Sequence, residues 1–153
     1  MPQVKLANIV NMPSRWWKQV GEELSAFIYE NTVDKGLDYK DQKFKALSPK
    51  YAKLKASGKL RRGGKSSKAN LFLSGDMMGS LRYISNTLKS VRFGWSMSES
   101  EKLVGNARRG RIVTDKTQAI SPKVARRLQK FIDKQTQKNI RKNDTVNRIK
   151  LGK

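Results

Sequence analysis

Apolar side chains recur every three or four residues in a segment near the start of the chain, as on one face of an α-helix. Pro13 suits the first position of such a helix and Gly36 suits its end, whereas Gly21 lowers the helix propensity slightly. The apolar positions are Trp16, Val20, Leu24, Phe27 and Ile28. The pattern therefore predicts an amphipathic N-terminal helix.

Trp16 and Trp17 are adjacent, so both side chains cannot point into one narrow apolar stripe. Two interpretations stay open. Either one tryptophan contacts a partner or caps the edge of the core, or both anchor the core; we favour the second.

A second helix is predicted near the end of the chain, with Ser121 as N-cap and Pro122 at the first helical position. Its apolar stripe consists of Val124, Leu128, Phe131 and Ile132. Basic side chains fill the other faces, so the helix could lie on a membrane or another protein. With one narrow stripe, packing on its own sheet is the default expectation. We expect the polar segment 143–153 to be a frayed tail.

Between these helices, Ser48-Pro49 is typical of an N-cap followed by a first-turn proline. A short helix through Tyr51 should end near Gly58. Residues 57–70 are rich in Gly, Ser, Lys and Arg and poor in large apolar side chains. They predict a long, flexible basic loop.

Strand-like patterns follow this loop. Residues 74–78 suit a capped helical turn, and residues 81–84 and 91–95 nearly alternate, with turn-forming residues between them, which predicts a β-hairpin. Short apolar pairs at 103–104 and 112–113 would add two strands. The expected arrangement is an antiparallel meander of three or four strands.

These elements predict an α+β fold, in which a small antiparallel sheet packs against an N-terminal and a C-terminal helix. At 153 residues, the chain is long enough for one ordinary domain. We expect a single domain over 1–142, with a flexible loop at 57–70 and a polar C-terminal tail at 143–153.

The charge distribution is strongly asymmetric. The formal net charge is +22, from 34 basic and 12 acidic side chains. Residues 46–70 carry eight basic side chains and no acid, and residues 120–153 carry eleven against two. Such blocks attract polyanions, meaning nucleic acid or an acidic protein surface, unless they serve only solubility.

Two basic clusters are the candidate contacts with nucleic acid or a protein partner, and both should be solvated in the free subunit. The first lies in the predicted loop: Lys59, Arg61, Arg62, Lys65 and Lys68. The second lies at a predicted strand connection: Arg108, Arg109 and Arg111.

The composition argues against catalysis, a cofactor or a metal site. The chain contains no histidine and no cysteine, which excludes a Ser–His–Asp triad and thiolate metal sites. The segment 63–66, Gly-Gly-Lys-Ser, lacks the earlier glycine and the preceding strand of a phosphate-binding P-loop. No apolar run approaches the ~20 residues of a membrane span, and no signal peptide is expected, so we expect a soluble protein without membrane contact.

Two segments resemble a known family. Residues 44–55 read FKALSPKYAKLK and residues 70–81 read NLFLSGDMMGSL. Their order and spacing resemble the minor virion proteins of tailed bacteriophages, which act in head–tail joining and tail completion. The structural positions of the two motifs are Ser48, Pro49, Tyr51, Leu73, Ser74, Gly75, Met77 and Leu81.

The resemblance implies a non-enzymatic structural protein of the virion neck or tail, assembled in the host cytoplasm. It implies a homo-oligomeric ring of about six or twelve copies. It also implies portal, adaptor or tail-tube proteins as partners. Two roles stay open for the basic clusters: contact with packaged DNA, or contact with acidic neighbouring proteins. Ser74 stands where Thr is commoner in the family, and 108–111 is unusually basic. The specific role therefore stays open between terminator, stopper, adaptor and tail-completion factor.

The alternative is a basic protein that binds nucleic acid independently of sequence. This alternative would be favoured if the monomer bound duplex nucleic acid with an affinity that falls steeply as the salt concentration rises.

Overall fold

The computed structural model describes residues 3–5, 12–59, 67–71, 75–87 and 89–151, and for 3–5 and 140–151 it describes the backbone alone. The chain is a mixture of helices and an antiparallel sheet, which confirms the predicted α+β class. The elements in chain order are β1 (Gln3–Lys5), α1 (Ser14–Tyr29), the π-helical turn η1 (Glu30–Asp34), α2 (Pro49–Ala56), α3 (Asp76–Gly79), β2 (Arg82–Thr87), β3 (Ser90–Gly94), α4 (Met97–Arg108) and α5 (Pro122–Leu151).

The predicted hairpin is present, but the predicted meander is wrong. Strands β2 and β3 pair antiparallel, with an irregularity between Tyr83 and Ser85. Residues 103–104 lie in α4, and residues 112–113 are not in a strand. An unpredicted N-terminal strand, β1, pairs with the other edge of β3 and gives the order β1-β3-β2. Two adjacent apolar residues, as at 103–104 and 112–113, are compatible with both the helical repeat and the alternation of a strand. They therefore do not distinguish strand from helix.

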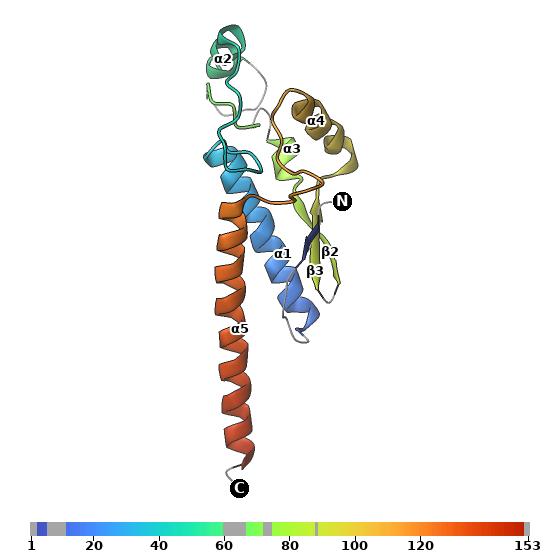
Figure 1. Ribbon diagram of the computed structural model, residues 1–153, viewed down its shortest axis with the longest axis vertical. Helices are drawn as coiled ribbons and strands as arrows, with labels where there is room; N and C mark the ends of the chain where they lie inside the picture. The colour runs from blue at the N-terminus through green and yellow to red at the C-terminus, as the bar shows by residue number, and fades with distance from the viewer. Residues whose placement is uncertain (1–2, 6–11, 60–66, 72–74, 88, 152–153) are drawn as a thin grey trace.

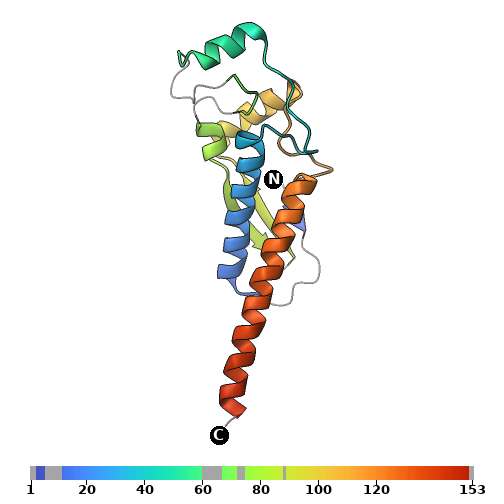
Figure 2. The same ribbon diagram turned by 90° about the vertical axis from the view of Figure 1, so that its left-hand side faces the viewer.

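Helices α1 and α5 lie on one side of the sheet, with α1 in contact with β2, β3 and α5 (Figures 1 and 2). Both tryptophans are core residues, with 3% and 2% of Trp16 and Trp17 exposed and their rings perpendicular at 5.0 Å. The favoured interpretation is therefore correct. Leu24 of α1, Leu128 of α5 and Phe93 of β3 belong to one buried cluster, so both helices contribute to the core beside the sheet.

The helix boundaries follow the local signals closely. Pro13 occupies the N-cap position of α1, and Gly36, with φ of +66°, ends the segment after η1. Ser121 caps α5, because its Oγ accepts a hydrogen bond from the backbone N–H of Val124 at 3.2 Å. The Asp41 carboxylate accepts a second one, from the N–H of Lys123 at 2.8 Å. Two otherwise unsatisfied donors of the first turn are thus bonded.

The predicted tail is wrong in its backbone conformation, because α5 continues through it to Leu151. No glycine or proline interrupts 123–151, which explains why the helix does not stop earlier. In Figure 1 the C-terminal part of α5 extends beyond the rest of the molecule. Within the described ranges, no helix combines the length and apolar character needed to cross a membrane.

Candidate functional site

A groove of about 630 Å³ lies between α2, the segment 67–71, α3 and the C-terminal half of α4. We call it the basic groove. It is lined by Leu47, Ser48, Tyr51, Lys55, Ala69, Asn70, Leu71, Gly75, Met77, Lys102, Gly105, Asn106, Arg109 and Arg111. Among the described residues, its lining contains four basic side chains and no acidic one.

One wall of the basic groove is α2, which stands apart from the helix pair in Figure 1. Ser48 is its N-cap, as predicted, and its Oγ accepts a hydrogen bond from the N–H of Tyr51 at 3.4 Å. Pro49 occupies the first helical position. Tyr51 and Leu54 are 38% and 40% exposed, so this short helix presents apolar surface to solvent.

The base of the groove is held by the buried ammonium of Lys55, which is 5% exposed. Its Nζ donates hydrogen bonds to the Lys68 carbonyl and to Asn70 Oδ1, both at 2.7 Å. Asn70 in turn donates from Nδ2 to the Val33 carbonyl at 3.1 Å. These bonds tie α2 and the end of the predicted loop to η1. The last residues of the predicted 57–70 loop are thus held by contacts with residues distant in the sequence, which local patterns do not reveal.

Lys55 also shares the groove with another cation. Burial lowers the pKa of Lys55, and the nearby positive charge of Arg111 lowers this pKa further. Arg111 is itself positioned by a hydrogen bond from its Nε to the Lys45 carbonyl at 3.4 Å. None of the ion pairs found among the described residues involves either side chain. Two neighbouring cations without a carboxylate partner form a favourable place for an anion.

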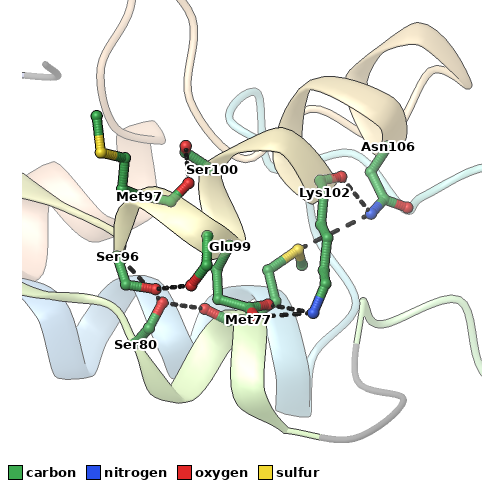
Figure 3. Close-up of polar contacts among 9 residues, drawn as sticks. Met77, Ser80, Ser96, Met97, Glu99, Ser100, Lys102 and Asn106 are labelled. Carbon is green, nitrogen blue, oxygen red and sulfur yellow. Dashed lines mark hydrogen bonds and ion pairs between the residues drawn. The ribbon is translucent and has the colours of Figure 1, made fainter.

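The opposite wall is built where α3 meets α4 (Figure 3). Ser80 joins the two helices, because its Oγ donates to the Met77 carbonyl at 2.9 Å and accepts from the N–H of Ser96 at 3.3 Å. Asn106 Nδ2 donates to the Lys102 carbonyl at 2.8 Å and lies 3.9 Å from the sulfur of Met77. This wall is therefore fixed by hydrogen bonds on both sides of Met77.

Lys102 differs from the other cations of the groove. Its Nζ donates to both carboxylate oxygens of Glu99, at 2.7 and 2.8 Å, one turn earlier on α4 (Figure 3). Its charge is thus partly neutralised, whereas Lys55, Arg109 and Arg111 have no such partner in the part of the chain that the structure describes.

The structure brings together six of the residues singled out in the sequence. Those that line the basic groove are Ser48, Tyr51, Gly75, Met77, Arg109 and Arg111. Five others are described but do not line it: Pro49, Lys59, Lys68, Leu81 and Arg108. Five lie outside the described residues: Arg61, Arg62, Lys65, Leu73 and Ser74.

Eight of the fourteen lining residues were not singled out in the sequence, among them three polar ones on which the site depends: Lys55, Asn70 and Lys102. Lys55 and Asn70 are separated by the predicted loop, and no local pattern marks a lysine that will be buried. Lys102 lies on the unpredicted helix α4. The spacing Ser96-x-x-Glu99, which is typical of a helix start, was the available signal for α4.

A second hollow, of about 820 Å³, runs along α1 beside β2 and α3 and is lined in part by Leu81. Its described lining carries charges of both signs, three acidic and two basic. Glu22 pairs with Lys18 at 3.8 Å, and Glu30 pairs with Arg127 at 2.6 Å. The basic groove, with its unmatched cations, is therefore the better candidate site.

The chemistry of the basic groove is that of binding. It offers cationic N–H donors beside apolar side chains, and the described residues contain no cluster of His, Cys, Asp and Glu that could hold a metal ion. No family model, no curated protein and no solved structure matches the chain.

Proposed function

We propose that this protein is a structural virion protein of a tailed bacteriophage. In this proposal it forms an oligomeric ring in the neck or in the tail-completion and terminator region between head and tail. One observation carries the proposal beyond the sequence resemblance. Ser48 and Tyr51 from the first motif and Gly75 and Met77 from the second line the same groove, although a loop separates the motifs along the chain. A shared surface is what two motifs of one assembly interface require.

Exposed apolar side chains add support. Met97 is 91% exposed and Val104 is 53% exposed on α4, and Tyr51 and Leu54 are exposed on α2. Helices α2 and α4 lie toward the same end of the molecule (Figure 1). Apolar side chains grouped at one end of a subunit are suited to contacts with other subunits. A ring needs two different, complementary surfaces on each copy, because each copy contacts its neighbours head to tail.

The test uses the phage whose genome encodes the chain. Mass spectrometry of purified particles should find the protein in a fixed copy number, as expected for a ring. Interrupting the gene should yield separate heads and tails, or heads that lose DNA, in electron micrographs of the lysate. Supplying the gene in trans should restore joined particles. Absence of the protein from particles, or normal infectivity without it, would refute the proposal.

The net charge of +22 supports one alternative, a basic protein that binds nucleic acid independently of sequence. That alternative expects the purified monomer to bind any duplex, with an affinity that falls steeply as salt rises. The virion proposal expects concentration-dependent rings, or co-purification with portal or tail-tube subunits. Measuring mass and duplex binding on the same sample separates the two.

A further inference from the structure

We infer that the basic groove binds a short peptide segment of a partner protein, in which carboxylates stand next to large apolar side chains. The inference deepens the proposed function and rests on it only for the identity of the partner as another virion subunit. The chemistry of the segment is argued from the groove itself.

The carboxylate of the segment would meet Lys55, Arg109 and Arg111. Lys55 has three N–H donors, and the two hydrogen bonds described above leave one for a ligand. A carboxylate in the groove would offset the repulsion between Lys55 and Arg111, which lowers the pKa of the lysine. Hydrogen bonds between charged groups are stronger than neutral ones and gain further strength where water is partly excluded.

The apolar side chains of the segment would lie against Leu47, Tyr51, Leu71 and Met77, which come from three parts of the chain: the start of α2, the segment 67–71 and α3. A volume of about 630 Å³ falls within the ordinary range of binding pockets. A peptide with charge alone would leave this apolar lining exposed to water. The groove therefore favours a segment with both kinds of side chain over a purely acidic one.

Duplex DNA fits the basic groove poorly. Its phosphates lie on a convex surface and are best met by protruding cations, whereas Lys55 is 5% exposed at the base of a concave groove. A duplex would meet the exposed Arg108 and Arg109 alike, although only Arg109 belongs to the groove lining. This difference allows peptide binding and DNA binding to be separated by substitution.

The experiment measures fluorescence anisotropy of a labelled short peptide in which glutamate and leucine alternate, titrated with the full chain. Arg109→Gln and Arg111→Gln should each weaken binding about tenfold, equivalent to ~1.4 kcal/mol. Arg108→Gln is the matched control, because it removes the same charge one residue away but outside the groove lining. It should change the affinity less than about twofold, because Arg108 does not line the groove and would not contact the peptide. Equal effects of all three variants would overturn the inference.

Two altered peptides and a DNA competitor complete the test. Replacing the glutamates with glutamine, or the leucines with serine, should each abolish most of the binding. The inference is overturned if the peptide binds equally well after its leucines are replaced. It is also overturned if a DNA duplex displaces the parent peptide and Arg109→Gln weakens duplex binding more than Arg108→Gln does. These outcomes do not depend on particle assembly, so the inference can fail while the virion proposal stands, and the reverse.

Discussion

At Gly21, α1 lies very close to Tyr83 of β2, and replacing this glycine with alanine should destabilise the protein. A Cβ atom at this position would lie 2.8 Å from Cγ and 2.9 Å from Cβ of Tyr83 on β2, and closer still to its Cδ2. Tyr83 cannot easily move aside. Its Cβ is attached to the strand, and its hydroxyl hydrogen-bonds to Asn86 at 2.6 Å. The helix and the strand would have to separate.

The magnitude follows from two opposing effects. Overpacking a tightly packed contact costs about 1–3 kcal/mol, and sometimes more. Alanine in a helix interior gains up to ~1 kcal/mol over glycine. The net expectation for Gly21→Ala is a loss of about 1–2 kcal/mol in the free energy of unfolding. For a chain of this size, each kcal/mol corresponds to about 2–4 °C in the melting temperature.

The control for this prediction is Gly105→Ala, at another helical glycine, where an added Cβ would meet nothing within 4 Å. It should raise the stability by about 0.5–1 kcal/mol through helix propensity alone. Urea and thermal unfolding followed by circular dichroism measure both variants. If Gly21→Ala is as stable as the parent, or gains stability as Gly105→Ala does, α1 does not pack against Tyr83 in this way.

Three further predictions concern a turn, an ion pair and the basic cluster. Gly75 has φ of +84°, so Gly75→Ala should lower the free energy of unfolding by about 1–2 kcal/mol. Gly79→Ala should not lower it, because the space around Gly79 is open. Equal melting temperatures of the two variants would contradict this prediction. Hydrogen bonds with Arg127 and Lys35 lower the pKa of Glu30 to about 2 from 4.5. The carboxylate therefore stabilises the fold above pH 4.5 and loses this contribution as the pH falls toward 2. Glu30→Gln should flatten the dependence of the urea midpoint on pH in that window, and an unchanged slope would refute the assignment. Replacing the arginine cluster with glutamine should leave the melting temperature unchanged or slightly higher, because these positive charges repel one another and Lys55. A marked fall in the melting temperature would show that the arginines stabilise the fold. The cluster consists of Arg108, Arg109 and Arg111.

The sequence alone determined the features that depend on neighbouring residues. The starts of the two long helices, the cap of α2 by Ser48 and the β2–β3 hairpin were all predicted close to their observed positions. Apolar periodicity, N-cap residues and turn residues act within a few positions of one another, so they are visible in a single sequence.

The candidate site was only partly visible for the same reason. The sequence identified the motif residues and two arginines. It did not show that they share a groove, because contacts across the 57–70 loop depend on the fold. The burial of Lys55 depends on Asn70, fifteen positions later, and on the Val33 carbonyl beyond it. A lysine in an otherwise basic segment carries no sign of this.

Only the tertiary structure decided which elements the weaker patterns would form. Residues 103–104 became helical within α4, and the third strand came from residues 3–5, whose pairing partner lies on β3, far along the chain. Gly21 was read as a small defect of α1, yet its missing side chain lets the helix approach Tyr83. Short apolar pairs and single glycines show no sequence periodicity. Their conformation and structural role are therefore set by the residues that pack against them.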